Sequence, residues 1–410
     1  MADVLWLQRS AGNHAVGLML RQPALGAPAA PKTDEQQWDE DWNDPDLASA
    51  RRHFAGTDRP AGSPRQRYDV LCPLYRDQGI KRPLKFVHDE IVDSDFFGHK
   101  TPMHRNLETA LKAAEATLNA AGVTDAPFHK CWAFNPRTQS GGQWSNHADG
   151  EAIDIDESTN PRLLDKRQRA VISALTEMDI SAANPGAAQG MDSYDANKQA
   201  SDRFQERYAA GGLAERAEQL ADEETDLDAE RKEIADALGL IPTGKGTSPR
   251  PTADQKKEAA ALNAKLKAKQ AEIKAAVAAR KALEGEHTRF LALDKAVDDL
   301  EKAIATLQSE VDRLNAELEQ LETTPQSADS KTQIDARRHA LAARTTAITA
   351  KQKQLAKAVK TRDDDPLRGY AKHGFLDLNK GMVDALKGAG LRWGGDYKGA
   401  KDFMHFEVVH

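Results

Sequence analysis

A strict heptad repeat is the feature that most constrains the fold of this chain. Between residues 293 and 321, apolar residues recur with steps that alternate between four and three. They are Leu293, Val297, Leu300, Ile304, Leu307, Val311, Leu314, Leu318 and Leu321. This 3.5-residue period predicts a long helix whose apolar seam packs against another helix as a coiled coil. The fold must therefore supply a helical partner for this segment.

Further heptads lie on both sides, in a region rich in Ala, Glu, Lys, Leu and Gln from about residue 202 to 361. The seven-residue repeats are Leu213, Leu220, Leu227 and Ile234, and then Ile334, Leu341, Ile348 and Leu355. Segments rich in Pro, Gly, Ser and Thr, at 239–251 and 323–330, divide the region into three helices. At about 1.5 Å per residue, the two outer helices together are as long as the middle one.

These lengths predict two antiparallel hairpins joined end to end, with both outer helix ends near residue 290. The middle helix is expected to kink or break just before that point, at Gly285. We expect the Leu220 region beside residues near 270 and the Leu341 region beside residues near 312. Contact between Leu220 and Leu341 would instead indicate one three-helix bundle. The sequence leaves open whether the coiled coil pairs within the chain or with a partner.

Two polar motifs flank this insertion, at residues 145–154 (SNHADGEAID) and 402–407 (DFMHFE). His147 and His405 offer imidazole nitrogens and Asp154 offers a carboxylate. Three protein ligands leave a fourth tetrahedral position for water, which is typical of a catalytic zinc. Asp402, three residues before a ligand, can face that water without binding the metal. We therefore predict His147, Asp154 and His405 as metal ligands and Asp402 as general base.

The motifs resemble those of the zinc peptidases that include D-alanyl-D-alanine carboxypeptidases and the L-alanyl-D-glutamate endopeptidases of phage endolysins. The family pattern Ser-x-His-x-x-Gly-x-Ala-x-Asp is present at 145–154, and the closing Asp-x-x-His-Phe-Glu at 402–407. The run from Gly390 to Tyr397 is similar to the Gly-Phe-x-Trp-Gly-Gly-x-Trp of the endopeptidase branch, with Tyr397 replacing the last aromatic residue. The resemblance covers roughly residues 68–200 and 363–410.

This resemblance implies an α+β fold, in which a small antiparallel sheet with flanking helices carries Zn2+. Where the family normally has a short connection, this chain has the all-α antiparallel coiled coil as a long insertion. It also implies a zinc metallopeptidase that cleaves peptidoglycan stem peptides as a carboxypeptidase or an endopeptidase. Arg137, eight residues before Ser145, stands where the family carries an arginine that contacts substrate or the developing oxyanion. Which peptide bond is cut stays open.

The alternative is a coiled-coil interaction or structural protein that holds zinc without turnover. The complete set of three ligands and a base favours the enzyme.

The predicted domains are an N-terminal motif over 1–21, a flexible linker over 22–66, a peptidase domain over 67–201 and 363–410, and the coiled-coil insertion over 202–362. Residues 7–16 resemble a motif of bacterial proteins associated with phage-tail-like contractile injection systems. They imply a delivery signal, injection-system components as partners, and a toxin effector that acts on a rival wall or the producer's own. Trp38 and Trp42 fit a short docking helix, but the proline-rich context favours a linker.

Charge and hydropathy exclude several other classes of protein. The net charge of −7 is unlike that of nucleic-acid-binding proteins, which have a basic surface. The sequence contains no run of 18 apolar residues, so no membrane span is predicted. Residues 1–21 lack the continuous apolar core of a secretion signal. We therefore expect synthesis in the bacterial cytoplasm and action at the cell wall after non-classical delivery. Cys72 and Cys131 leave open a disulfide or two buried thiols.

Overall fold

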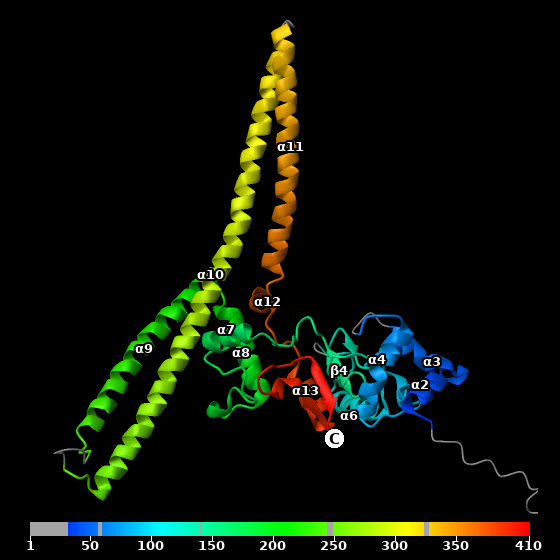
Figure 1. The fold of residues 1–410 in the computed structure, drawn as a ribbon, viewed down its shortest axis with the longest axis vertical. Helices are drawn as coiled ribbons and strands as arrows, with labels where there is room; N and C mark the ends of the chain where they lie inside the picture. Colours follow the sequence, from blue (N-terminus) through cyan, green and yellow to red (C-terminus); the bar gives the residue numbers. More distant parts are fainter. Residues whose placement is uncertain (1–31, 56–59, 140–141, 244–248, 324–327) are drawn as a thin grey trace, which may run out of the picture. The chain divides into compact units, whose positions relative to one another are not determined.

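The computed structural model describes residues 32–55, 60–139, 142–243, 249–323 and 328–410 (Figure 1). Contacts divide the chain into two units, Met1–Val92 with Phe134–Gly150, and Asp93–Ala133 with Glu151–His410. The expected N-terminal motif over 1–21 and the first part of the expected linker, up to residue 31, lie outside the described residues. Among the helices that are described, none is both long enough and apolar enough to cross a bilayer.

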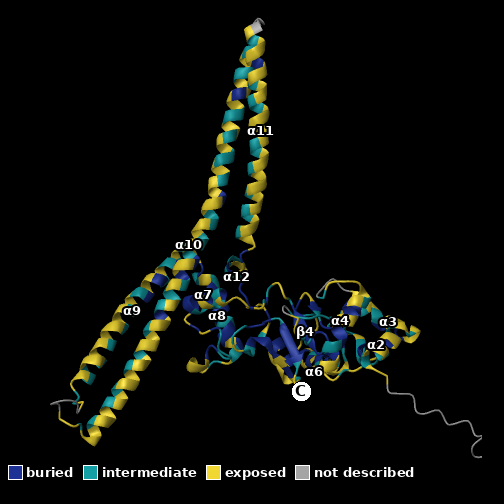
Figure 2. Cartoon of the chain, viewed as in Figure 1, coloured by how far each residue is buried: buried dark blue, intermediate teal, exposed yellow. Residues whose placement is uncertain are grey.

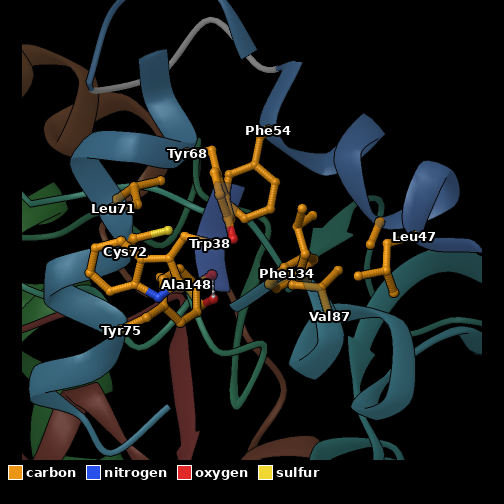
Figure 3. Close-up of a cluster of buried hydrophobic side chains, with 12 residues drawn as sticks. Trp38, Leu47, Phe54, Tyr68, Leu71, Cys72, Tyr75, Val87, Phe134 and Ala148 are labelled. Carbon is orange, nitrogen blue, oxygen red and sulfur yellow. Dashed lines mark hydrogen bonds between the residues drawn. The ribbon is translucent and has the colours of Figure 1, made fainter. Parts of the chain in front are cut away.

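The first unit is built from short helices around a buried aromatic cluster. Its elements are α2 (Asp34–Asn43), η1 (Pro45–Leu47), α3 (Ala48–Arg51), η2 (Arg52–Ala55), α4 (Pro64–Asp77) and α5 (Pro83–Glu90). Figure 3 shows Trp38 and Phe54 packing with Tyr68 and Tyr75 of α4. The Phe54 and Tyr68 rings meet edge to face with centroids 5.2 Å apart, a favourable geometry for aromatic pairs.

The prediction of a flexible linker over 22–66 is therefore wrong for residues 34–55. Thr33 caps α2 through a capping box with Gln36, which supplies the helix start that the proline-rich composition obscured. Trp38 is 6% exposed, and its indole donates a hydrogen bond to the Lys81 carbonyl at 2.9 Å. Burial of a few large aromatic side chains outweighs the polar composition of this segment.

The second unit contains the predicted small antiparallel sheet. The elements outside the insertion are β1 (Ile91–Phe96), β2 (His99–His104), α6 (Arg105–Ala120), β3 (Cys131–Trp132), β4 (Ala152–Ile155), α7 (Lys166–Thr176), η3 (Ala187–Gln189), α8 (Ser193–Arg207), α12 (Pro366–His373), α13 (Lys380–Gly388), β5 (Leu391–Trp393), η4 (Gly394–Asp396) and β6 (His405–Val408). Among the described residues, four strands form one sheet in the order β3-β4-β6-β5. Helices α6 and α13 contact each other, and α6 contacts β6 while α13 contacts β5.

The insertion consists of three helices, α9 (Ala210–Gly239), α10 (Ala253–Thr323) and α11 (Ala328–Asp363). Helix α10 contacts both α9 and α11, and Figure 1 shows α9 beside its first half and α11 beside its second half. The predicted pair of hairpins is thus observed. Helix α10 runs through Gly285 without a break, so of the two expected alternatives the break is wrong, and a kink there stays a prediction. Figure 2 shows the outward faces of these helices exposed.

Ion pairs fix the register of each hairpin. In the second hairpin, Arg344 pairs with Glu310 and Arg337 pairs with Glu317 at 2.6 Å, which places Leu341 opposite residues near 313, as predicted. In the first, Glu224 accepts hydrogen bonds from Arg280 at 2.6 and 3.2 Å. Leu220 therefore faces residues near 284 rather than 270.

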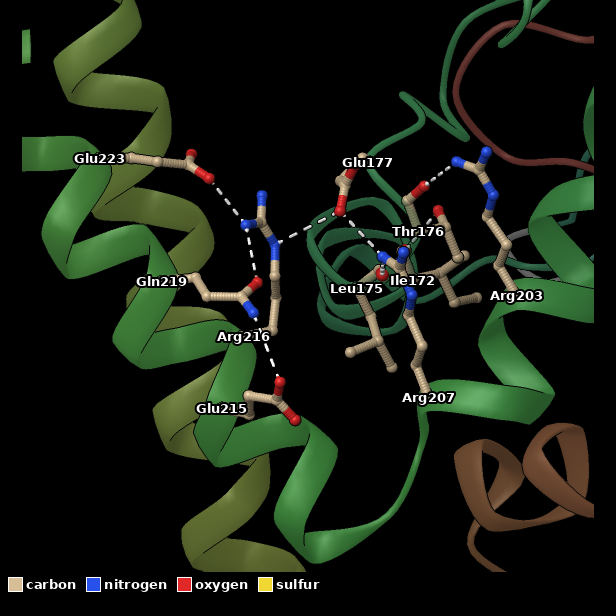
Figure 4. Close-up of polar contacts among 10 residues, drawn as sticks. All are labelled: Ile172, Leu175, Thr176, Glu177, Arg203, Arg207, Glu215, Arg216, Gln219 and Glu223. Atoms are coloured by element: carbon tan, nitrogen blue, oxygen red, sulfur yellow. Dashed lines mark hydrogen bonds and ion pairs between the residues drawn. The ribbon is translucent and has the colours of Figure 1, made fainter.

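The physical reason for this shift lies at the base of the first hairpin. Residues 202–207, expected in the insertion, belong to α8, and α9 begins only at Ala210. Arg203 and Arg207 of α8 donate to the carbonyls of Thr176 and Leu175 at 3.1 and 2.9 Å (Figure 4). Because these are the last carbonyls of α7, the arginines cap that helix and hold α8 in the enzyme part of the unit.

The middle of α10 joins the rest of the second unit close to residue 290, as expected. Glu286 is 2% exposed and accepts hydrogen bonds from Arg167 of α7 and from the Tyr208 hydroxyl, the latter at 2.7 Å. Arg368 of α12 lies over the Phe290 ring, 3.9 Å from its centroid. Buried polar groups with satisfied partners fix such a junction in one geometry.

Both cysteines are free and buried. Burial raises the pKa of the Cys72 and Cys131 thiols to about 12, so both stay protonated and unreactive at neutral pH. Of the two states that the sequence left open, the structure shows buried thiols.

Candidate metal centre

Two predicted ligands face each other across neighbouring strands. Strands β4 and β6 pair antiparallel, with Asp154 directly opposite His405. Asp154 is 2% exposed and His405 is 9% exposed. Residues directly opposite in an antiparallel pair have Cβ atoms about 4.5–5.5 Å apart, so the sheet register itself brings these two side chains together.

The His405 ring has a different carboxylate at each nitrogen. Its Nδ1 lies 2.9 Å from an oxygen of Asp154, and its Nε2 lies 3.4 Å from an oxygen of Glu407. Burial alone would lower the pKa of His405, but the hydrogen bonds with Asp154 and Glu407 overcome it and raise the pKa to about 9. The nearby charge of Asp402 adds to this rise.

The third predicted ligand, His147, is held in a tight turn within residues 145–150. The amide of Asn135 donates to the His147 carbonyl at 2.8 Å, and the amide of Ala148 donates to the Ser145 carbonyl at 2.7 Å. Gly150 has φ of 77°, a conformation that glycine adopts without strain. His147 is 3% exposed.

The ligand atoms that His147, Asp154 and His405 offer all lie within 4.8 Å of one another. Two imidazoles and one carboxylate match the donor set of a catalytic zinc, which takes three protein ligands and keeps one position open. A buried carboxylate behind a ligand histidine, here Glu407, is the outer partner that such histidines usually have. The residues present therefore fit zinc.

Hydrogen bonds of its own amide and carbonyl groups position Asp402, the predicted base. Its amide donates to the Gly394 carbonyl at 3.1 Å, and its carbonyl accepts from the His405 amide at 3.1 Å. Its carboxylate lies 3.3 Å from Nε of Arg162, and the residue is 6% exposed. This turn links the predicted base to His405, the predicted metal ligand three residues later.

The remaining predicted site residue, Arg137, lies between β3 and β4 in the same stretch of chain as His147, and is half-buried. Its role stays a prediction. Trp393 is fully buried and donates to the Phe403 carbonyl at 2.9 Å. It belongs to the core.

Sequence reasoning missed the role of Glu407. This residue is 3% exposed and accepts hydrogen bonds from Arg392 and Tyr397 in addition to its contact with His405. Its place in the closing motif was a signal, but its partners depend on the pairing of β5 with β6. Glu151 is 9% exposed and accepts from Asn106 at 2.8 Å.

Comparison with known families agrees with the second motif. A family model described as D-alanyl-D-alanine carboxypeptidase matches residues 338–408. The match includes Asp402, His405 and Glu407, and suggests a peptidase that acts on peptidoglycan. Comparison with curated proteins and with solved structures found no match.

Proposed function

We propose that this chain is a zinc-dependent peptidase that cleaves peptidoglycan stem peptides. The observation that carries the proposal is the buried Asp154–His405 pair with His147 close enough to share one metal ion. The family match over 338–408 supports the same chemistry, since it includes Asp402 and His405.

Each polar residue then has a role. When bound, zinc polarises the scissile carbonyl and lowers the pKa of water. Asp402 takes the proton of the attacking water and returns it to the leaving amine as the C–N bond breaks. Arg162, 3.3 Å from Asp402, favours the charged carboxylate that a base requires. Arg137 contacts the substrate carboxylate or the developing oxyanion.

The test combines metal content with wall digestion. The purified full chain should release stem-peptide fragments from isolated peptidoglycan with zinc and stop with a chelator. His147→Ala should lose the metal. Asp402→Ala should keep it while the rate falls by at least ~100-fold. Zinc bound without any release by the wild type would favour the inactive coiled-coil alternative, and an Asp402→Ala variant without zinc would contradict the assigned roles.

We further propose that the protein is an effector delivered to the cell wall by a contractile injection system. Residues 7–16 support this, because they resemble a motif of proteins associated with such systems. Deletion of residues 1–21 should abolish co-purification with injection-system particles while wall digestion by the purified chain is retained. Undiminished co-purification after the deletion would refute this role of the segment.

A further inference from the structure

Glu407 is a buried acceptor at the centre of a polar network on β5, β6 and the segment between them. It lies two residues after His405 on β6, so both side chains are on the same face of the strand. One oxygen, Oε1, accepts from Nε of Arg392 at 2.7 Å and from the Tyr397 hydroxyl. The other, Oε2, faces Nε2 of His405 at 3.4 Å.

The two nitrogens of His405 are therefore in different environments. Nδ1 is beside Asp154, which is itself a member of the candidate metal set, whereas Nε2 is beside Glu407. A histidine that binds a metal does so through one ring nitrogen, and the other nitrogen donates its hydrogen to an outer acceptor. The nitrogen beside Asp154 is thus the one that would face a bound metal.

We infer that Glu407 is a positioning residue, which holds the proton of His405 on Nε2 and so leaves the Nδ1 lone pair for the metal. This inference rests on the proposed zinc-dependent function. Arg392 stands opposite Glu407 on the neighbouring strand β5, and its guanidinium favours the charged carboxylate. Since Arg392 and Tyr397 both bind Oε1, they fix the carboxylate with Oε2 directed toward the imidazole.

Glu407→Gln in the full chain tests this arrangement. Arg392 and Tyr397 both donate, so the single amide oxygen of glutamine turns to them and the amide NH2 group turns to Nε2. An NH2 group at Nε2 favours the tautomer that carries its hydrogen on Nδ1, which opposes metal binding. Zinc affinity, measured by competition with a chromophoric chelator and without any wall substrate, should fall about 10–100-fold. In 15N-histidine spectra of the zinc-loaded protein, the Nε2–H of His405 should lose its acceptor, so its signal should broaden by exchange with water.

Glu286 provides a matched control. It is equally buried, at 2% exposed, and also accepts from one tyrosine and one arginine, Tyr208 and Arg167. Glu286→Gln should therefore disturb a similar network while zinc affinity and the Nε2–H signal of His405 stay as in the wild type. Tyr397→Phe, which removes one donor to Glu407 but keeps the ring, should weaken zinc binding in the same direction by a smaller factor. This variant keeps the test decisive if Glu407→Gln does not fold.

The outcomes separate the two proposals. A wild-type chain that binds no zinc overturns the proposed function, and the role of Glu407 falls with it. Zinc binding by the wild type, with unchanged affinity and an unchanged Nε2–H signal in Glu407→Gln, overturns only the positioning role. An equal loss of affinity in Glu286→Gln would also overturn it, because the effect would then be one of general stability.

Discussion

Gly394→Ala tests whether the position of Asp402 controls the reaction. A methyl group built at Gly394 lies 2.2 Å from the Asp402 carbonyl oxygen and 2.8 Å from its Cβ. Real Cβ atoms essentially never come within 3.0 Å of such atoms, and the difference from 2.2 Å requires a shift of about 0.8 Å. The hydrogen bond from the Asp402 amide to the Gly394 carbonyl is strained by the same movement.

A misplacement of about 1 Å costs roughly 100-fold in rate, which corresponds to about 2.7 kcal/mol of transition-state stabilisation. We expect Gly394→Ala to release stem-peptide fragments about 100-fold more slowly at saturating concentrations of peptidoglycan. Elemental analysis should show that zinc is still bound. Gly369→Ala in α12 is the control, since a methyl group there meets nothing within 4 Å. Full activity in a folded Gly394→Ala variant, or an equal loss in Gly369→Ala, would refute the reasoning.

Three further predictions concern stability. Trp38→Ala should lower the free energy of unfolding of the first unit by about 3–5 kcal/mol in chemical denaturation; a change below about 1 kcal/mol would mean that the 34–55 segment is not part of the core. Burial lowers the pKa of Lys401 from 10.5 to about 8, so the unfolded chain holds more protons than the folded one between these values. Wild-type stability should therefore rise relative to Lys401→Met from about pH 8 to pH 10.5, and parallel thermal-unfolding curves would contradict this. Glu310→Lys should destabilise the second hairpin by less than about 1 kcal/mol, and adding Arg344→Glu should restore part of the loss; a double-mutant cycle with no coupling would exclude that pair from the hairpin's stability.

The candidate metal ligands, whose donor atoms lie within 4.8 Å of one another, could be picked out from the sequence because the residue pattern of each motif is local. His147 and Asp154 belong to one motif, and His405 belongs to another with its own flanking pattern. The role of Glu407 could not be predicted, because it depends on strand register. Only when β5 pairs with β6 does Arg392 stand opposite Glu407, and nothing in either strand alone specifies that partner.

The helices at residues 34–55 escaped prediction for a different reason. Their sequence is polar and proline-containing, and only a few large side chains, Trp38, Leu47 and Phe54 among them, are buried. The apolar surface that covers these side chains comes from α4 and α5, later in the chain. A sequence pattern shows which apolar side chains a segment can bury. Here the stabilisation of the segment depends on the apolar surface of α4 and α5, against which those side chains pack.

The apolar heptads predicted the hairpins but do not by themselves select the helix pairs, since any seam can pack against another. Charge makes the selection. Helix α9 has ten acidic and three basic residues, and the first half of α10, residues 253–285, has four acidic and eight basic. The second half, residues 286–323, has ten acidic and four basic, and α11 has three acidic and nine basic. Each hairpin thus joins an acidic helix to a basic one, through pairs such as Arg280–Glu224 and Arg344–Glu310. If α9 packed against residues 286–323 and α11 against residues 253–285, like charges would face each other along both seams. Charge therefore disfavours this exchanged arrangement, although the apolar seams would be buried equally well in it.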